Sequence, residues 1–343
     1  MYKKSKNKTI SIVKHHRRKK QKPMSYNKKN IIALNIQFMI HPPPLRKGSR
    51  VALVATARKV TPGEIQPSVE LLRSWSLEPV VPDSLFAADH QLAGSDAQRA
   101  ATLQHFINDN SIEALFCVRG GYGTVRIVDQ IDFSPLVRHP KWIVGYSDVT
   151  VLHSHVGRHC NLATLHATMP VNIPADPACW NAPAIESLRR ALFERSADIT
   201  TEAGPLNRNG RCQAQVVGGN LSILYSLCGS DSDIETDGKI LLIEDLDEYL
   251  YHIDRMMQNL KRTGKLHRLK GLIVGAMNEM HDNAVPFGRQ AEEIIYDTVR
   301  EYCYPVAFHV PIGHIGTDNR ALILGADTTL EINDTHTRIT QSC

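Results

Sequence analysis

The sequence predicts an α/β protein of two domains, the first of which is built around a parallel β-sheet. After residue 49, short apolar runs alternate with amphipathic stretches, a rhythm typical of a parallel sheet with helices on both faces. The run 112–118 is almost continuously apolar, as expected of a strand that is buried on both faces. A length of 343 residues is also long for a single hydrophobic core, which favours two domains.

The N-terminal half is expected to alternate strands and helices. Strands are predicted where β-branched and other apolar residues cluster, at 50–56, 78–83, 112–118 and 141–147. Helices are predicted where apolar residues recur at helical spacing, at 62–75, 95–109 and 124–131. Ser95 is a suitable N-cap for the second of these helices.

The C-terminal half follows a proline-rich connection at 171–210 that holds one helical segment. Strands are then predicted at 238–245, at 271–277 and within 321–332, and helices at 249–264 and 289–303. The apolar residues of the first of these helices fall on one face; they are Leu250, Ile253, Met256, Met257 and Leu260. We therefore predict an extension at 1–48, an N-terminal domain at 49–170, the connection, and a C-terminal domain at 211–343.

Positive charge is concentrated at the start of the chain. Residues 1–50 hold fifteen of the 40 Lys and Arg and no acid, which leaves 25 basic against 35 acidic residues, a net charge of −10, in the remainder. Such an arm could bind nucleic acid through phosphate contacts. It could also be a disordered extension, or the result of a start codon assigned too early, with Met39 as the alternative start. We favour the last two readings together, and we do not expect nucleic acid as a partner.

No segment indicates export or membrane insertion. The apolar segment 31–40 is short, contains Asn35 and Gln37 and runs into three prolines, unlike a signal peptide. No apolar run reaches the roughly 18 residues of a membrane-spanning helix. The seven cysteines are odd in number and form no CxxC pair, which fits reduced thiols. We therefore expect a cytoplasmic protein with no membrane partner.

A glycine-rich loop, RGGYGT from Arg119 to Thr124, follows the strand at 112–118. Consecutive glycines allow backbone N–H groups to approach a ligand closely. The loop lacks the Lys-Ser/Thr pair of a P-loop and is one glycine short of a dinucleotide-binding fingerprint. Taken alone, it favours a tight turn between a strand and a helix.

The stretch WIVGYSDVT, residues 142–150, places a Ser-Asp pair after the next strand. A nucleophile elbow needs a strand, a sharp turn that exposes a hydroxyl, and a helix start. Gly145 leaves room for such a turn, but Val149 stands where the second glycine of the G-x-S-x-G form would be. Ser and Asp are also leading capping residues. On local pattern alone, Ser147 and Asp148 are better explained as a helix N-cap.

A serine nucleophile would need a histidine base. Among the 16 histidines, His155 and His159 lie four residues apart on one helical face. No third ligand is indicated by spacing, so we interpret this pair as solvated and expect no metal. His314 ends the apolar run VPIGH on a Gly-His step, from which a loop can project an imidazole into a cleft. An ordinary loop histidine explains the same pattern.

Glu244 is the acid best placed by its strand. It ends the apolar run KILLIE, and catalytic groups gather at the carboxyl ends of strands in parallel sheets. Three further acids lie beside it, Asp245, Asp247 and Glu248. Local pattern cannot choose between Glu244 and these neighbours, and an acidic helix start would explain the cluster of four equally well.

Six stretches together resemble the LD-carboxypeptidase family of serine peptidases, which includes the microcin C immunity proteins. They occur in the family's order between about residues 49 and 340, and they are LAGSDAQRAATLQHFIND, FCVRGGYGTVRIVDQIDF, KWIVGYSDVTVLH, VVGGNLSILYSLCGS, GKILLIEDLDEYLYHIDRMM and VPIGHIGTDNRALILGA. Each is weak alone, but six in order are specific. The resemblance implies a flavodoxin- or Rossmann-like N-terminal domain and a swivelling β/α C-terminal domain.

The resemblance also implies a Ser–His–Glu triad that closes between the two domains. The family motifs G-[YH]-S-D, E-D-x-x-E and G-H assign the nucleophile to Ser147, the orienting acid to Glu244 and the base to His314. The backbone N–H groups of Gly121 and Asp148 are implied as the oxyanion hole. No cofactor is implied.

The implied activity is removal of a terminal D-alanine from murein tetrapeptides in peptidoglycan recycling, by cleavage of an L,D-peptide bond. The substrate carboxylate needs a cationic or N–H partner. Arg119 is one candidate, although a surface salt bridge would also explain it, and Asn220 is either a second contact or a turn residue. Dimers are common in the family, so a homodimer is also considered.

Three stretches depart from the family pattern. VATAR stands where the family tends to show A-P-S, ATLHATMP replaces the commoner H-G-P-M, and the extension before residue 49 has no counterpart. The alternative function is an immunity-type hydrolase of peptide- or aminoacyl-nucleotide antibiotics. The interval of 97 residues between Ser147 and Glu244 favours the carboxypeptidase. The third hypothesis, a binding module without catalysis, is disfavoured by the intact Ser, Glu and His.

Overall fold

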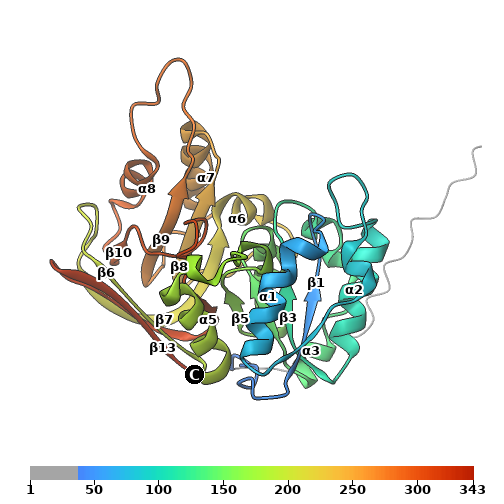
Figure 1. Ribbon diagram of the computed structural model, residues 1–343. Coiled ribbons are helices and arrows are strands. Elements are labelled where there is room, and N and C mark those ends of the chain that lie inside the picture. The colour runs from blue at the N-terminus through green and yellow to red at the C-terminus, as the bar shows by residue number, and fades with distance from the viewer. Residues whose placement is uncertain (1–37) are drawn as a thin grey trace, which may run out of the picture. The chain divides into compact units, whose positions relative to one another are not determined.

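The computed structural model describes residues 38–343, which form two β-sheets with helices packed against them (Figure 1). The basic segment 1–37, including most of the predicted extension, lies outside the described residues. Each sheet contains a run of adjacent parallel strands, so the α/β fold class is confirmed. Within 38–343, no helix has both the length and the apolar character that crossing a bilayer requires.

The first sheet has six strands in the order β11-β5-β4-β3-β1-β2. Their bounds are β1 Arg50–Val54, β2 Glu78–Val80, β3 Ile112–Cys117, β4 Trp142–Gly145, β5 Thr164–His166 and β11 Leu322–Leu324. Strands β1 to β5 are parallel, whereas β11 pairs antiparallel with β5. Although β11 belongs to the predicted C-terminal domain by its place in the sequence, it is therefore an edge strand of the first sheet.

The second sheet has seven strands in the order β10-β9-β8-β7-β12-β13-β6. Their bounds are β6 Ser196–Glu202, β7 Gly210–Asn220, β8 Ile240–Leu246, β9 Gly271–Asn278, β10 Val306–Ala307, β12 Asp327–Ile332 and β13 His336–Ser342. Strands β7 to β10 are parallel, and β12, β13 and β6 continue the sheet antiparallel from β7.

Eight α-helices are present in the described residues. They are α1 Pro62–Ser74, α2 Asp96–Asn108, α3 Pro135–Arg138, α4 Thr150–Cys160, α5 Ala182–Glu194, α6 Leu221–Leu227, α7 Leu250–Arg262 and α8 Ala291–Val299. Ser95 caps α2 as predicted, because its side chain accepts the N–H of Gln98 and the Gln98 side chain accepts the N–H of Ser95.

Burial agrees with the periodicity of the sequence at its strongest points. In β3, Ala114 and Phe116 pack in one hydrophobic cluster, while Leu115 and Cys117 pack in another, so the strand is covered on both faces as predicted. The predicted apolar face of α7 is buried throughout, with side chains that are 0–4% exposed. Spacing alone therefore identified both of these core surfaces.

The segment 124–131 differs from the predicted helix. It forms two 3₁₀ turns, Thr124–Arg126 and Val128–Gln130, separated by Ile127 with φ −117°. The backbone N–H of Thr124 donates to the carboxylate of Asp148, so a tertiary contact fixes the first turn. Eight residues are too few for a helix to form on propensity alone, and the tertiary contact decides the local structure.

The predicted connection 171–210 contributes a strand as well as the expected helix. Strand β6 pairs with β13 over its full length and buries Ala197 and Ile199 in alternation with exposed residues. In the sequence, the proline-rich segments on either side of the strand obscure this period of two. The connection therefore holds the outer edge of the second sheet.

Part of the predicted extension packs on the first sheet. Ile40 forms a parallel bridge with Leu162, and the carbonyl of Pro43 accepts a hydrogen bond from the indole N–H of Trp142 at 2.9 Å. Leu45 is buried and its N–H donates to the carbonyl of Leu192. Among the described residues, packing on the first sheet thus extends at least to Ile40, nine residues before the predicted boundary at 49.

Candidate active site

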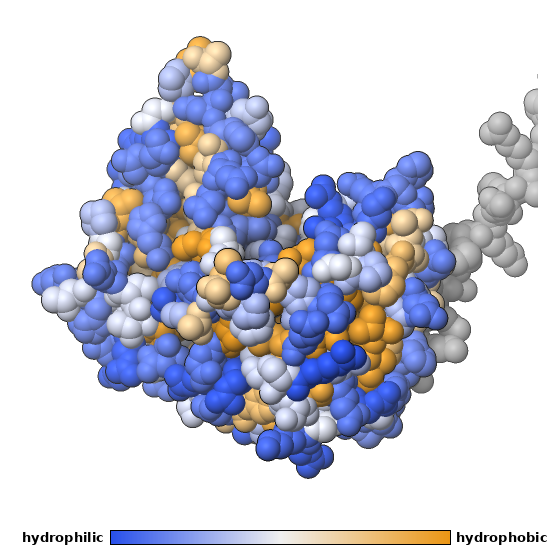
Figure 2. All heavy atoms as spheres, in the orientation of Figure 1, coloured by the Kyte–Doolittle hydropathy of each residue, from blue (hydrophilic) through white to orange (hydrophobic). Residues whose placement is uncertain are grey.

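The candidate residues follow the carboxyl ends of parallel strands in both sheets, where ligands gather in open α/β structures. In the first sheet these are the loops after β1, β3 and β4, and in the second they are the ends of β7, β8 and β9 and the segment after β10. The surface is hollowed between the part that carries α1 and α2 and the part that carries α7 and α8, at the end toward which β1 points (Figures 1 and 2).

Ser147 lies on a sharp turn between β4 and α4. Residues Ser147–Val149 form one 3₁₀ turn, and α4 follows from Thr150. The backbone of Ser147 has a φ of +63°, a left-handed conformation that costs a residue with a Cβ about 1–2 kcal/mol. The N-cap of α4 is Val149 and makes no side-chain capping bond, so the capping hypothesis for Ser147 is wrong. A strained, exposing turn is what a nucleophile elbow requires.

The glycine-rich loop packs directly against this turn. A Cβ on Gly120 would lie 2.9 Å from both Cβ and Oγ of Ser147 and 3.4 Å from the backbone nitrogen of Asp148. The buried carboxylate of Asp148 accepts the N–H of Thr124 at 2.9 Å. These contacts tie the loop after β3 to the turn after β4 and bring the loop backbone beside the serine hydroxyl.

Replacing Gly120 with alanine is expected to lower kcat by about 100-fold, because the added methyl must displace the Ser147 side chain from its position. Hydrolysis rates and thermal unfolding would be measured together. Gly63→Ala is the matched control, since a Cβ on Gly63 meets nothing within 4 Å. A folded Gly120→Ala protein with the kcat of the wild type would contradict the close packing of loop and nucleophile.

Glu244, which is buried, and His314, which is partly buried, form a hydrogen-bonded pair. The Oε2 of Glu244 lies 2.6 Å from Nδ1 of His314 and also accepts the backbone N–H of His314 at 3.2 Å. Gly313 has a φ of +95°, and a Cβ there would overlap the Glu244 side chain, so the approach depends on glycine. Asn278, at the end of β9, donates to the His314 carbonyl at 2.6 Å. A carboxylate at Nδ1 favours the tautomer that leaves Nε2 free to accept a proton.

A second histidine faces the other oxygen of Glu244. His166 ends β5, is fully buried, and its Nε2 lies 3.8 Å from Oε1 of Glu244. This separation is too long for a hydrogen bond, and neither ring nitrogen of His166 has a hydrogen-bond partner among residues 38–343. The carboxylate of Glu244 is thus enclosed between two imidazoles.

This environment shifts the pKa values of the pair in opposite directions. Burial by itself would raise the pKa of Glu244, but the imidazoles of His166 and His314 outweigh it and hold the pKa well below its usual range. Burial by itself would lower the pKa of His314, but its hydrogen bond to Glu244 and the charge of that carboxylate raise it above its usual value. Glu244 is therefore ionised, and His314 is more basic than a free imidazole.

Tyr146 connects the nucleophile turn to this pair. Its ring packs edge-to-face against the imidazole of His314, with 4.7 Å between the ring centroids. Its hydroxyl donates to the side-chain oxygen of Asn172 at 3.3 Å, and the residue is buried. The residue that directly precedes the predicted nucleophile, Ser147, therefore packs on the imidazole of the predicted base.

The two predicted substrate contacts are engaged within the protein. The guanidinium of Arg119 forms an ion pair with Glu64 at 3.0 Å and donates to the carbonyl of Lys59 at 3.1 Å. The side-chain oxygen of Asn220 caps α6, and its side-chain nitrogen donates to Asp245 at 2.9 Å. Asn220 therefore fixes the start of α6 to the end of β8.

Of the two histidines on α4, His159 is exposed as predicted, whereas His155 is partly buried, and both are hydrogen-bonded. Nδ1 of His155 lies 2.9 Å from the hydroxyl of Ser232, and Nε2 of His159 lies 2.7 Å from the carbonyl of Asp231. Burial lowers the pKa of His155 to about 4, so this ring is neutral. The pair joins α4 to the segment before β8, and this structural use could not be read from helical spacing.

Two residues of the site were missed in the sequence. Tyr146 lies inside the nucleophile motif, but an aromatic residue at the end of a strand is expected to be core. His166 was visible only as part of ATLHATMP, at the end of a strand of three residues. A histidine at the carboxyl end of a parallel strand was the available signal.

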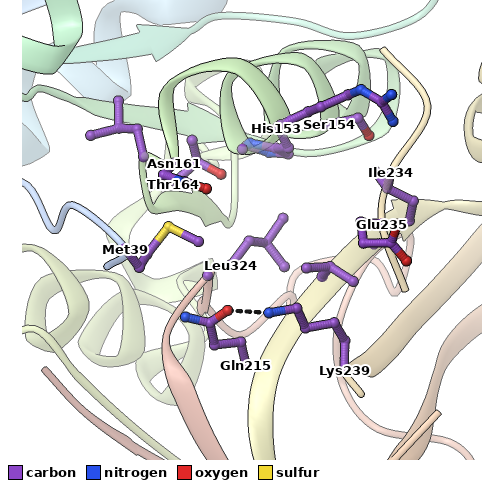
Figure 3. A pocket seen from close by; sticks show the side chains of 16 residues that line it. Met39, His153, Ser154, Asn161, Thr164, Gln215, Ile234, Glu235, Lys239 and Leu324 are labelled. Atoms are coloured by element: carbon purple, nitrogen blue, oxygen red, sulfur yellow. Dashed lines mark hydrogen bonds between the residues drawn. The ribbon is translucent and has the colours of Figure 1, made fainter. Parts of the chain in front are cut away.

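A cavity of about 450 Å³ lies along the C-terminal half of α4, apart from the predicted triad. Figure 3 shows His153, from α4, on one side of it and the hydrogen-bonded pair of Gln215 and Lys239 on the other. None of the three triad residues lines this cavity. The chemistry of the candidate site is therefore at the strand ends and not in this cavity.

Comparison with known proteins gives the family. Residues 51–167 match the LD-carboxypeptidase N-terminal domain, and residues 213–330 match the LD-carboxypeptidase C-terminal domain. The chain is 34% identical over 294 residues to a probable murein peptide carboxypeptidase of Bacillus subtilis, covering 83% of this chain and 89% of the relative. It is 27% identical over 293 residues to the murein tetrapeptide carboxypeptidase of Pseudomonas aeruginosa, covering 83% and 94%.

Solved structures share the fold. A muramoyltetrapeptide carboxypeptidase from Oxalobacter formigenes has a TM-score of 0.77 at 22% identity, covering 86% of this chain and 99% of that chain. The microcin C7 self-immunity protein MccF in complex with aspartyl sulfamoyl adenosine has a TM-score of 0.77 at 19% identity, covering 89% and 98%. These likenesses support the two-domain architecture, and the matches to both domain families confirm the resemblance seen in the motifs. The chain belongs to the LD-carboxypeptidase family of peptide hydrolases.

Proposed function

We propose that this protein is a serine carboxypeptidase that releases terminal D-alanine from murein tetrapeptides by hydrolysing an L,D-peptide bond. The observation that carries the proposal is the hydrogen bond between Glu244 and His314, whose ring packs against Tyr146, the residue before a serine on a strained turn. The names of the relatives from Bacillus subtilis and Pseudomonas aeruginosa support the substrate class.

The proposed reaction has two steps. Nε2 of His314 accepts the proton of the Ser147 hydroxyl while the serine oxygen attacks the carbonyl carbon that precedes the D-residue. The C–N bond then breaks, and the departing amine takes the proton from His314. A water molecule, deprotonated by His314, hydrolyses the acyl-enzyme and restores the serine. Glu244 remains ionised throughout and stabilises the imidazolium that forms in each step.

The oxyanion hole is proposed to consist of the backbone N–H groups of Gly121 and Asp148. Its support is the packing of the glycine loop on Ser147 and the hydrogen bond from the Thr124 N–H to the Asp148 carboxylate, which keeps the loop beside the turn. One such donor typically stabilises the transition state by about 3 kcal/mol.

The activity is expected to fall as the pH drops through the raised pKa of His314. The base must be neutral to accept the serine proton, so the acid limb of the kcat/KM profile should have its midpoint above the usual histidine value of about 6.5. Measuring D-alanine release between about pH 5 and 9 checks this expectation. An acid limb with its midpoint below the usual histidine value would contradict the assignment of His314 as the base.

The decisive test is incubation of the protein with a murein tetrapeptide and quantification of free D-alanine, with Ser147→Ala as the control. Release by the wild type and not by the variant supports the proposal. The alternative substrate is an aminoacyl sulfamoyl adenosine. Cleavage of that compound without release of D-alanine would replace the proposed function with that of an immunity-type hydrolase.

We further propose that the protein works in the cytoplasm, in the recycling of peptidoglycan fragments. The support is that all seven cysteines are free thiols and that Cys117 and Cys160 are buried. Burial raises the pKa of both thiols, to about 12 and about 11, so neither is a reactive thiolate.

A further inference from the structure

One guanidinium lies across the glycine-rich loop without an ionic partner. Arg58 follows β1, and its backbone N–H donates to the carbonyl of Gly120 at 3.4 Å. Its side chain runs over the Cα of Gly121, so that a Cβ there would lie 2.6 Å from Cδ and 2.9 Å from Nε of Arg58. Gly121 has a φ of +103°, and its lack of a side chain is what admits the arginine.

The other arginines around the loop are neutralised by carboxylates. Arg119 pairs with Glu64 at 3.0 Å, and Arg126 pairs with Asp96 at 2.7 Å. Arg58 is exposed and takes part in no ion pair within the part of the chain that the structure describes. Among the arginines around this loop, Arg58 is therefore the one whose charge is available to an incoming anion.

Two neighbouring glycines of the loop contact the nucleophile and this arginine, one each. Gly120 packs on Ser147, and its neighbour Gly121 packs on Arg58. Consecutive Cα atoms are about 3.8 Å apart, so a group bound across both glycines spans the distance of about one residue. In a substrate whose scissile bond precedes its last residue, the free carboxylate is also one residue beyond the carbonyl that Ser147 attacks.

We propose that Arg58 binds the terminal α-carboxylate of the substrate and thereby restricts cleavage to the last residue of the peptide. This inference rests on the proposed function. The planar guanidinium can donate two parallel N–H bonds to a carboxylate, a geometry that an amide or an internal peptide bond does not match. Arg58 replaces Arg119 in this role, because Arg119 is already bound to Glu64.

The test compares a murein tetrapeptide that ends in D-alanine with the same peptide ending in D-alaninamide. The wild type is expected to prefer the free carboxylate in kcat/KM. Arg58→Gln should lower kcat/KM for the free carboxylate by a factor of about 10 to 100 and leave that for the amide unchanged. Arg58→Lys should restore part of the preference, because lysine keeps the positive charge but lacks the two parallel N–H donors of the guanidinium.

Lys59→Gln is the matched control, since it removes the same charge one residue away and should keep the preference of the wild type. Thermal unfolding confirms that each variant is folded. An unchanged preference in Arg58→Gln, an equal loss on both peptides, or a collapse of the preference in Arg119→Gln instead would overturn the assignment while leaving the peptidase intact. Absence of cleavage of either peptide by the wild type would overturn the proposed function and this assignment with it.

Discussion

Replacing Ser147 with alanine is expected to lower kcat for D-alanine release by a factor of about 10⁴ to 10⁶. The hydroxyl is the proposed nucleophile, and no other group at the turn can form the acyl-enzyme. Binding is expected to persist, because the glycine loop and Arg58 are untouched. Steady-state hydrolysis, together with calorimetric titration of the tetrapeptide, would measure the two effects separately.

Comparison with glycine at the same position separates chemistry from strain. Ser147→Gly should be as inactive as the alanine variant, yet more stable than it by about 0.5–1 kcal/mol, because glycine relieves the left-handed backbone at φ +63°. Chemical denaturation of the two variants gives this difference directly. If the alanine variant were the more stable, the turn would not be strained in the way its backbone indicates.

Replacing Glu244 with glutamine is expected to lower kcat by about 10⁴-fold with little change in KM. The amide keeps the shape of the side chain but removes the charge that orients His314 and stabilises its protonated form. The acid limb of the pH profile should also move to lower pH, because the hydrogen bond and the charge that raise the pKa of His314 are lost.

Asp247→Asn is the matched control for this substitution. Asp247 lies three residues further along, is exposed, and contacts His281 outside the proposed triad. The Asp247→Asn variant should retain the kcat and the pH profile of the wild type. Equal losses in Glu244→Gln and Asp247→Asn would mean that the acidic cluster acts by its net charge and not through Glu244.

The choice between the acids of this cluster follows from the alternation of a strand. Glu244 and Asp245 point to opposite faces of β8. Glu244 turns toward His314, whereas Asp245 turns toward Asn220 and accepts its side-chain N–H. Burial and the neighbouring Glu244 raise the pKa of Asp245 to about 7, so this acid is a poor orienting carboxylate. Sequence spacing locates the cluster, but only the neighbours across the strand decide which member faces the base.

Sequence reasoning succeeded where the pattern depends on one element and failed where it depends on two. The buried face of α7 and the cap at Ser95 are local properties, and both agree with the structure. The backbone conformation of Ser147 is set by contacts with the glycine loop and by the bond of Asp148 to that loop. These tertiary contacts cannot be seen in the local pattern, which by itself favoured a cap. The role inferred for Arg58 likewise depends on a loop more than sixty residues away.

The pairing of β11 with β5 anchors the segment that carries the proposed base, His314. The segment that carries His314 leaves the second sheet at β10 and enters the first sheet at β11, beside the strand that ends in His166. It is thus a covalent tether anchored at both ends, one in each sheet. A cut between the two halves of the chain would leave β5 with an open edge and the base without its second anchor. The enzyme is therefore not divisible into two interchangeable modules. Insertions between β10 and β11 would make the position of His314 relative to Ser147 less fixed.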